Sequence, residues 1–526
     1  MASVTSLGAA FRALSCGVLG LAIFATATPT AAQVWRSDSG RGTYANPPLN
    51  ADYPDPDIIR VGEDFYFAST TFVNTPGLVI LHSKDLVNWD IVGHVIPRLT
   101  GNPKYDLVDG GDYRHGVYAP SLRYQKGRFY IAVTPVGGHT RIYSAAKING
   151  PWTMRELDRE AFDPGLFFDT DGKAYIATAI GSNGTITLLS LNDDLSAVVD
   201  ARVVHFNKGA EGSKLIRRGD WYYLFNAIPS RLGLTVSRAK SLTGPWETRP
   251  QIDDKTGGHQ GALVDLPDGA WYGFVMLDAG AVGRVTNISP VFWRDDWPVW
   301  GAPEAPGRVP ATAAKPIQGH AFREPPSSDA FSSGVLGRQW QWNHNPDDQR
   351  WSLTERPGFM RLKATSSETF WAARNTLVQK GQGPRSRGVA KLDLRGLAVG
   401  DQCGLGTFGK FSAQLVVTRT SDGQGEVSAR LIESTVQGSK VVSLSQPYKV
   451  ALTDLWLAVS MDFTTDKSTL SYSQDGKTWA SLPGDFPLAF DWRTGTFQGE
   501  QYGLFCYNPT GGEGRLDIDS FTLEKP

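Results

Sequence analysis

The chain has 526 residues, too many for one ordinary hydrophobic core, so it must form two or more domains or one very large β fold. Its 52 Lys and Arg residues against 53 Asp and Glu give a formal net charge of −1, and we expect neither nucleic acid nor an anionic membrane surface as a partner. The 57 Gly, 32 Pro, 16 Trp, 17 Tyr and 25 Phe favour turns and strands over helices. The composition therefore predicts an all-β protein.

Residues 1–32 have the pattern of an export signal. One basic residue, Arg12, precedes an apolar stretch over residues 18–25, and small residues end the segment at Ala32. We expect cleavage near Ala32 and a secreted or periplasmic mature chain. The apolar stretch is shorter than the roughly 20 residues needed to cross a bilayer, and no later run reaches that length, so we expect no membrane insertion.

A turn followed by an aromatic strand occurs five times in the first 300 residues. The segments are GEDFYFA, KGRFYIA, DGKAYIA, RGDWYYLF and DGAWYGF, with their marker tyrosines at Tyr66, Tyr130, Tyr175, Tyr222 and Tyr272. Repeats of this length, built from short strands, are typical of propeller blades, each of which buries its faces against its neighbours. No helix-period stretch recurs between them, which disfavours a solenoid. We predict a five-bladed β-propeller over residues 46–300.

The remainder of the chain predicts a linker and a second β domain. Residues 301–328 contain six prolines, and we expect an extended segment that does not pack. Residues 329–526 alternate apolar and polar positions without helical periodicity, which predicts a β-sandwich. After the export signal the chain contains two cysteines, Cys403 and Cys506, and the sequence leaves open whether they form a disulfide or remain buried thiols.

Counting back 11 to 13 residues from each marker tyrosine reaches the same point of each blade's innermost strand. The residues at these five points are Asp55, Tyr118, Asp163, Glu211 and His259. An acid beside Pro or Gly commonly begins a turn, which explains one such residue but not three acids in register. We predict that the five side chains converge on the propeller axis.

Two carboxyl groups facing each other across a pocket can hydrolyse a glycosidic bond, because one protonates the leaving oxygen while the other deprotonates a water. Blades 1 and 4 are not neighbours in a ring of five, so Asp55 and Glu211 should face each other with room for that water. A separation of roughly 6.5 to 9.5 Å predicts inversion at the anomeric carbon. Asp163, on the blade beside Glu211, is placed to raise the pKa of that acid by like-charge proximity.

In these segments the chain resembles glycoside hydrolase family 43, which includes β-xylosidases and α-L-arabinofuranosidases. The matching segments, in the family's order, are NPPLNADYPDPDIIRVGEDFYFASTTF, PGLVILHSKDLVNW, VYAPSLRY, FDPGLFFDTDGKAY, AEGSKL, GGHQGALVD and VFWRDDWPVWG. The segment DAFSSGVLGRQWQWNHNPDD and its continuation resemble the concanavalin-like jelly-roll sandwich of two-domain members. The resemblance implies that Asp55 is the general base, Asp163 the pKa modulator and Glu211 the general acid.

The resemblance also assigns residues around the acids. It implies that His259 is the axial histidine near the pocket floor and that Arg284 holds a sugar hydroxyl. Phe72 and Tyr118 are candidates to stack on a pentose ring, although core packing explains these two aromatic residues equally well. Many family members have Trp where this chain has Tyr118, so the sequence does not fix the shape of the subsite.

The activity implied is that of an exo-glycosidase that releases a terminal pentose, with β-D-xylosyl favoured, from xylo-oligosaccharides or arabinoxylan-type hemicellulose. The alternatives are an α-L-arabinofuranosidase using the same three acids and a non-catalytic carbohydrate-binding propeller. A retaining fructosidase is disfavoured, because its NDPNG, RDP and EC motifs are replaced here by YPDPD, FDP and AEG. We expect no required cofactor and no catalytic metal, since the histidines show no HExxH spacing. A structural Ca²⁺ near His259 and the oligomeric state stay open.

Overall fold

The computed structural model describes residues 1–3, 34–252, 258–435 and 438–526, so residues 4–32 of the predicted export signal lie outside the described part. The described chain is almost entirely β, as the composition predicts. Its helices are four short 3-10 turns: η1 (Pro103–Asp106), η2 (Ile180–Ser182), η3 (Pro229–Arg231) and η4 (Gly280–Val282). Among the described residues, no helix has the length and apolar character required to span a membrane.

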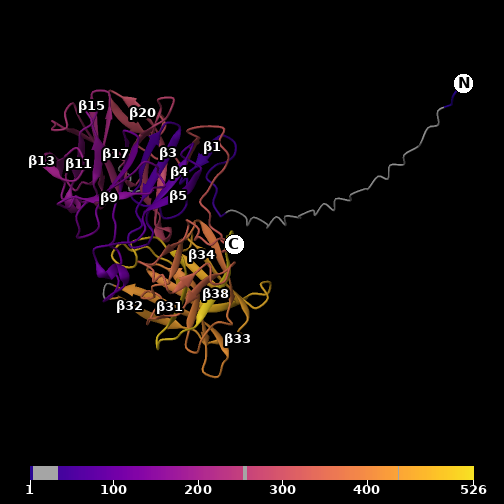
Figure 1. Ribbon diagram of the computed structural model, residues 1–526. Helices are drawn as coiled ribbons and strands as arrows, with labels where there is room; N and C mark the ends of the chain where they lie inside the picture. The colour runs from indigo at the N-terminus through magenta and orange to yellow at the C-terminus, as the bar shows by residue number, and fades with distance from the viewer. Residues whose placement is uncertain (4–33, 253–257, 436–437) are drawn as a thin grey trace.

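Five four-stranded antiparallel sheets follow one another along the chain and form the predicted five-bladed propeller. Figure 1 shows it above the orange-to-yellow C-terminal domain. Blades 1 and 2 comprise β2 (Asp57–Val61), β3 (Asp64–Ser69), β4 (Gly77–Ser83), β5 (Trp89–Ile96), β6 (Ser121–Gln125), β7 (Arg128–Val133), β8 (Arg141–Ala145) and β9 (Thr153–Glu156). Blades 3 and 4 comprise β10 (Gly165–Phe168), β11 (Ala174–Thr178), β12 (Thr185–Leu191), β13 (Val198–Phe206), β14 (Glu211–Arg218), β15 (Trp221–Ile228), β16 (Gly233–Ala239) and β17 (Glu247–Ile252). Blade 5 comprises β18 (His259–Asp265), β19 (Trp271–Asp278), β20 (Arg284–Arg294) and β21 (Trp297–Trp300).

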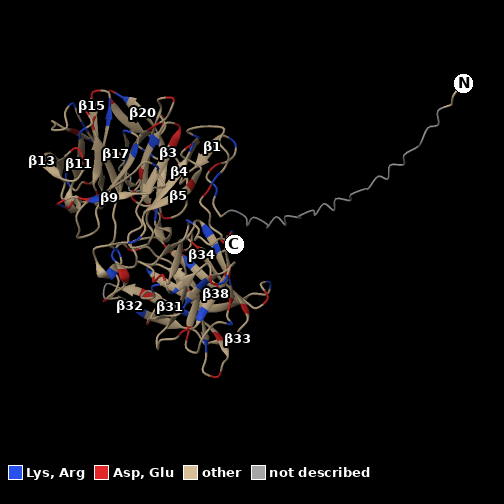
Figure 2. Ribbon diagram, in the orientation of Figure 1, with Lys and Arg blue, Asp and Glu red and all other residues tan. Residues whose placement is uncertain are grey.

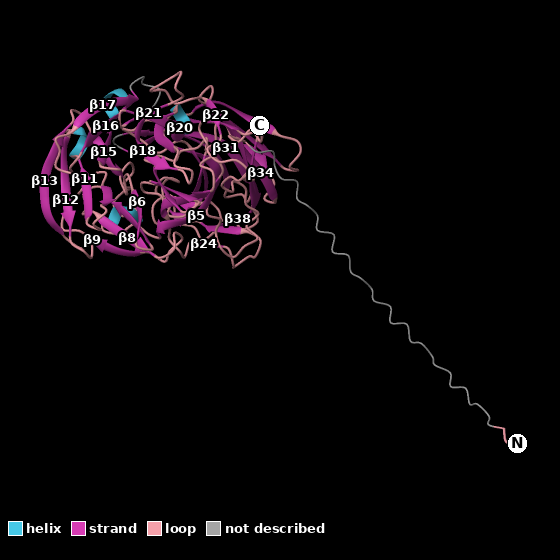
Figure 3. Ribbon diagram, turned by 90° about the horizontal axis from the view of Figure 1, so that it is seen from above, coloured by secondary structure: helices cyan, strands magenta, loops and turns pink. Residues whose placement is uncertain are grey.

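The first strand of each blade lies innermost. These strands contact one another in a closed circle: β2 meets β6, β6 meets β10, β10 meets β14, β14 meets β18, and β18 meets β2. Seen from above in Figure 3, β6 and β18 lie toward the middle and the last strands β9, β13 and β17 lie at the rim. Apolar clusters fill the spaces between blades, for example Leu122 and Ile131 between blades 1 and 2. The blades therefore stack around one axis.

Part of the linker pairs with the propeller, contrary to the expectation that it does not pack. Strand β22 (Thr312–Ala314) forms an antiparallel ribbon with β1 (Thr43–Ala45). The next residue, Lys315, is buried, and its Nζ lies 2.6 Å from Asp38 and 2.9 Å from Asp85. The six prolines remove backbone donors elsewhere in the segment, but residues 311–315 are free of proline and keep the N–H groups that a ribbon needs.

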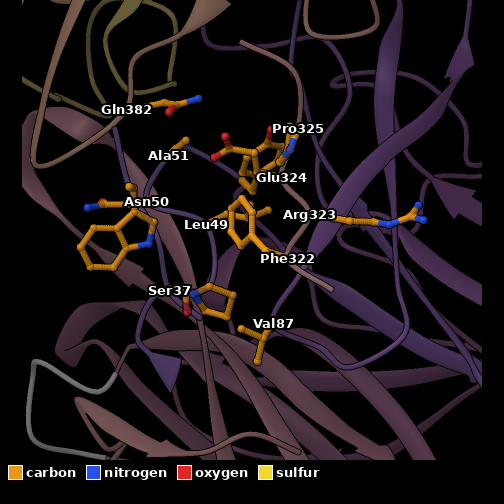
Figure 4. Close-up of a pocket in the computed structure, with 13 residues that line it drawn as sticks. Ser37, Leu49, Asn50, Ala51, Val87, Phe322, Arg323, Glu324, Pro325 and Gln382 are labelled. Carbon is orange, nitrogen blue, oxygen red and sulfur yellow. The ribbon is translucent and has the colours of Figure 1, made fainter. Parts of the chain in front are cut away.

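The end of the linker also packs. Figure 4 shows residues 322–325 beside Leu49 and Val87 of the propeller side and Gln382 of the C-terminal domain. These residues surround a cavity of about 30 Å³. Such a space has room for about one water molecule and none for a sugar.

The C-terminal domain is a sandwich of two sheets, as predicted, and both are antiparallel except where β26 pairs with β37. The larger sheet has the path β23 (Gln341–Trp342), β27 (Leu377–Lys380), β37 (Gln501–Asn508), β29 (Gln402–Phe408), β30 (Phe411–Arg419), β31 (Gly425–Thr435) and β32 (Gly438–Leu444), with β26 (Thr365–Ser366) and β33 (Tyr448–Val450) alongside. The smaller sheet has the order β24 (Trp351–Ser352), β25 (Met360–Lys363), β38 (Arg515–Glu524), β28 (Arg385–Asp393), β34 (Asp454–Asp462), β35 (Lys467–Ser473) and β36 (Ala480–Pro487). Cys403 and Cys506 face each other on β29 and β37 and form a disulfide, which resolves the alternative left open by the sequence.

The two domains are joined by backbone and side-chain hydrogen bonds at the loop between β3 and β4. Thr75 and Trp342 exchange two backbone hydrogen bonds of 3.0 and 2.6 Å. Asn74 donates to the side chain of Gln501 at 2.8 Å, and Gln498 donates to the backbone of Thr71 at 3.2 Å. Figure 2 shows acidic and basic residues interspersed over both domains. The sandwich is thus fixed against the face of the propeller that carries this loop.

Candidate active site

A cavity of about 780 Å³ opens where the first strands of the five blades begin. All seven sequence-predicted site residues line this one cavity: Asp55, Phe72, Tyr118, Asp163, Glu211, His259 and Arg284. The cavity is large enough for a monosaccharide and part of a second sugar, because ligand pockets span about 300–1,000 Å³. The rest of its wall comes from β18 and β19, from loops within and between blades, and from the sandwich.

The five residues found by counting back do not all lie within the innermost strands. Glu211 and His259 are the first residues of β14 and β18. Asp55 lies two residues before β2, Tyr118 three residues before β6, and Asp163 two residues before β10. The side chains still reach one cavity because each lies at the same end of its blade, next to the axis. The sequence count was therefore right about position and wrong about the strand boundaries.

Backbone strain gathers at these positions. Asp55 has φ 54° and Asp163 has φ 45°, both in the left-handed region that few residues other than glycine adopt. Next to Glu211, Gly212 has φ 58°, and a Cβ atom there would overlap the side-chain amide of Gln260. Non-glycine residues in such conformations cost about 1–3 kcal/mol each and are found preferentially at functional sites.

Asp163 is buried, and its pKa is strongly raised. Burial raises its pKa well above the ordinary value, and the nearby charges of Glu211 and Asp55 raise it further. Gln260 donates a hydrogen bond of 3.2 Å to Oδ2 of Asp163 and opposes the rise. These three acids therefore share one low-dielectric space, which favours the protonated forms of Asp163 and Glu211.

Glu211 has a raised pKa, chiefly because burial penalises its charged form. Ser182, on η2 of blade 3, donates a hydrogen bond to Oε2 of Glu211 and lowers the pKa in part. The charge of His259 also lowers it, while that of Asp55 raises it. A carboxyl group with this balance is suited to hold a proton and to donate it near neutral pH.

Asp55 has a cation beside it. Nη1 of Arg284 lies 3.6 Å from Oδ1 of Asp55, and both side chains are largely buried. The backbone N–H of Arg284 is itself fixed by Oδ1 of Asp52 at 2.7 Å. The guanidinium of Arg284 thus offers N–H donors next to the carboxylate of Asp55.

His259 pairs with an acid that the sequence did not single out. Its Nε2 lies 3.3 Å from Oδ1 of Asp278, the last residue of β19. Burial by itself raises the pKa of Asp278, but the hydrogen bond and charge of His259 outweigh it and hold the pKa below the ordinary value. Within the described residues no group of three His, Cys, Asp or Glu side chains could hold a metal ion. This pair offers one carboxylate and one imidazole, so waters would supply most of the ligands of a Ca²⁺ ion bound there.

Phe72 and Tyr118 meet edge to face at a centroid distance of 5.7 Å on one wall of the cavity. Phe72 also packs at 4.8 Å against Phe497, a residue of the sandwich. The guanidinium of Arg284 lies 5.1 Å from the ring centroid of Phe72 and 4.6 Å from that of Phe497. The rings thus enclose the arginine from two sides, in addition to lining the space where a sugar would lie.

The loop between β36 and β37 closes one side of the cavity. Phe490, Trp492, Arg493 and Phe497 of this loop line the cavity with the propeller residues. Nη1 of Arg114 donates to the backbone oxygen of Arg493 at 2.8 Å and joins this loop to the propeller. The other residues missed by sequence reasoning, Ser182, Gln260 and Asp278, are on the propeller, and only Gln260 had a local signal, its position beside His259.

Comparisons with known proteins match both domains. Residues 44–298 match the model of glycosyl hydrolases family 43, and residues 328–524 match that of the β-xylosidase C-terminal concanavalin A-like domain. A β-xylosidase from Formosa agariphila is 31% identical over 93% of this chain and 91% of its own length.

Solved structures agree with this match. A bifunctional GH43-CE protein of Bacteroides eggerthii superposes with a TM-score of 0.83 and 33% identity over 92% of this chain, which spans only 64% of that longer protein. A family 43 hydrolase with an engineered active site, displaying both endo-xylanase and exo-arabinofuranosidase activity, gives a TM-score of 0.85 with 28% identity over 92% of this chain and 100% of its own.

The fold and the acidic axial cavity, together with these matches, define a two-domain glycoside hydrolase of the propeller–sandwich type. The chain belongs to glycosyl hydrolase family 43.

Proposed function

We propose that the protein releases a terminal β-D-xylosyl residue from xylo-oligosaccharides or arabinoxylan-type hemicellulose with inversion at the anomeric carbon. The observation that carries this proposal is the meeting of three acids in one cavity, where Arg284 pairs with Asp55 and burial raises the pKa of Glu211. One acid is thereby suited to accept a proton and another to donate one.

In the proposed reaction, Asp55 acts as the general base and Glu211 as the general acid. A water molecule attacks the anomeric carbon and transfers a proton to the carboxylate of Asp55, while the bond from that carbon to the leaving oxygen breaks. Glu211 gives its proton to the leaving oxygen. Asp163 acts on Glu211 as the second member of a coupled pair of acids, and proton exchange with solvent restores both groups.

The remaining residues are proposed to position the sugar. Arg284 offers N–H donors to a sugar hydroxyl beside Asp55, His259 approaches from the floor of the cavity, and Phe72 and Tyr118 cover an apolar ring face. The wall of Phe72, Phe497 and Arg284 closes the inner end, which supports attack on a chain end and not on the middle of a chain. No cofactor is needed for this chemistry.

The sugar proposal rests on relatives. The Formosa agariphila relative is a β-xylosidase, which supports the xylosyl reading. The exo-arabinofuranosidase activity of the engineered family 43 hydrolase supports α-L-arabinofuranosyl as the second candidate. Both pentoses would place their hydroxyls near the same groups, so the test below uses both.

Proton NMR of the first turnover tests the proposal. With xylobiose as substrate we expect α-xylose to appear before mutarotation, and a slower release of arabinose from an arabinofuranosyl substrate. Initial formation of β-xylose would contradict inversion, and faster release of arabinose would reverse the order of the two sugars. If the protein hydrolyses neither substrate, the non-catalytic, sugar-binding alternative is favoured.

We also propose that residues 1–32 direct export to the periplasm or medium, which the basic start, apolar stretch and small residues before Ala32 support. N-terminal sequencing of the exported protein should begin at Gln33. Recovery of the full-length chain with Met1 in the cytoplasm alone would contradict this.

A further inference from the structure

A second cavity adjoins the candidate active site. It has a volume of about 550 Å³ and lies between the connection from β5 to β6, residues 97–120, and the sandwich. Arg114 and Arg493 line both cavities, so the two spaces meet at this pair of residues. We call this second cavity the side groove.

The exposure of the lining residues shows which end of a substrate would reach the side groove. Arg284 at the inner end of the active site is 5% exposed and Phe72 is 1% exposed, whereas Trp492 is 56% exposed. A chain whose terminal sugar lies against the buried residues must leave past the exposed ones. Trp492 is next to Arg493 in the chain, so a substrate that leaves past Trp492 brings its leaving-group portion to Arg114 and Arg493, at the entrance of the side groove.

The side groove has a strong excess of basic side chains. Lys104, Arg114, His115 and Arg493 line it, and Asp112 is the one acid among the described residues that do so. The carboxylate of Asp112 is already engaged, because Nδ1 of His115 lies 3.0 Å and Nδ2 of Asn102 lies 3.1 Å from its oxygens. The surface presented to a ligand is therefore cationic, although the whole chain is nearly neutral.

Trp371 of the sandwich forms part of the wall of the side groove. It lines the side groove and is 5% exposed, and within the described structure its indole Nε1 has no hydrogen-bond partner. Its ring is held by stacking on Phe408 at 4.3 Å, and its backbone oxygen accepts a hydrogen bond from the hydroxyl of Tyr113. The indole Nε1 is itself enclosed by protein atoms, so the ring forms a fixed apolar part of the groove wall.

We propose that the side groove binds a carboxylate-bearing sugar, such as a uronic acid substituent, on the leaving-group portion of the substrate. This inference rests on the proposed function, because it takes the buried end of the active site as the place of the terminal sugar. The basic side chains would attract the carboxylate and donate hydrogen bonds to it. The protein would then prefer acidic hemicellulose chains over neutral chains of equal length.

The test compares three substrates at low ionic strength: an aryl xyloside, a neutral xylo-oligosaccharide, and a xylo-oligosaccharide of equal length with a uronic acid on an inner residue. We expect kcat/KM for the acidic chain to exceed that for the neutral chain by about fivefold or more, and the preference to fall in 0.5 M NaCl because salt screens exposed charges. Lys104→Glu should remove most of the preference without changing turnover of the aryl xyloside. Lys147→Glu, which alters an exposed lysine outside both cavities, is the matched control.

Equal turnover of acidic and neutral chains by the unaltered protein, or a preference that survives both salt and Lys104→Glu, would overturn the proposal. If the protein hydrolyses none of the substrates, the proposed function fails, and calorimetric Kd values for the acidic and neutral chains decide the side groove separately.

Discussion

The propeller and the sandwich contribute different kinds of residue to the active-site cavity. The propeller supplies the ionisable groups, with Asp55, Asp163, Glu211 and His259 at corresponding ends of four blades. The sandwich supplies a single loop with three aromatic rings and backbone oxygens that bind Arg114 and Arg284. The acids are held by a closed ring of strands, whereas the loop is held by its contacts with that ring.

The propeller therefore provides the groups that transfer protons, and the sandwich provides part of the wall that encloses the substrate. A change on the propeller side should abolish a proton transfer, while a change on the sandwich side should weaken substrate binding and leave the acids able to act. In kinetic terms the first should lower kcat, and the second should raise KM more than it lowers kcat.

The largest effect is expected from Asp55→Asn. Removal of a general base costs about 10²–10⁴ in rate, and we expect kcat for xylobiose to fall by about 10³ or more while substrate still binds. The variant is compared by calorimetric binding and by kcat.

The matched control is Asp57→Asn, two residues further along the chain. Asp57 is buried, accepts hydrogen bonds of 2.8 Å from Leu122 and Arg123, and is not among the residues that line the cavity. Its substitution should lower Tm, with much smaller loss of kcat in the folded protein. Equal losses of kcat in the two variants would contradict a chemical role for Asp55.

A smaller effect is expected from Phe497→Ala on the sandwich side. The ring contacts both Phe72 and Arg284, and loss of about 1–2 kcal/mol of apolar contact corresponds to about a fivefold to thirtyfold loss of kcat/KM. The loss should lie mainly in KM, measured with xylobiose, and Phe497→Leu should recover part of it. A loss confined to kcat would contradict the proposal that the sandwich side acts in substrate binding and not in proton transfer.

The smallest effect is expected from Ser182→Ala. Its hydroxyl donates to the carboxylate of Glu211 and lowers the pKa of this acid, so removal of the hydroxyl should raise that pKa further. Glu211 then keeps its proton to higher pH, and the alkaline limb of the kcat profile should move upward. We expect a loss below about tenfold at the optimum. A limb that stays in place or moves downward would contradict the role of Glu211 as the proton donor.

The sequence predicted the propeller side well because the blades repeat. Each marker tyrosine lies on the second strand and pairs with the first strand, as Tyr66 does with Ile59 and Tyr222 with Arg217. A count back along the first strand therefore reaches the axis in every blade. The count varies between 11 and 13 from blade to blade.

The sandwich side could not be predicted in the same way. The loop that carries Phe490 and Phe497 occurs once, lies more than 200 residues beyond the last catalytic candidate, and reaches the cavity only through tertiary packing. Ser182 likewise lies on the 3-10 turn η2 between the second and third strands of its blade. The turns at the same place in blades 4 and 5, η3 and η4, begin at different counts from their marker tyrosines, so no fixed count identifies Ser182. The pairing of β22 with β1 was not predicted, because the six prolines of the linker indicated an extended segment that does not pack.

The most direct test of the account is the leaving-group dependence of Glu211→Gln. The variant cannot donate a proton, so we expect kcat/KM for xylobiose to fall by about 10³, while that for a dinitrophenyl xyloside, whose leaving oxygen needs no proton, should fall less than about tenfold. Equal losses on the two substrates, or ordinary turnover of xylobiose, would contradict the assignment of Glu211 as the acid that opens the glycosidic bond.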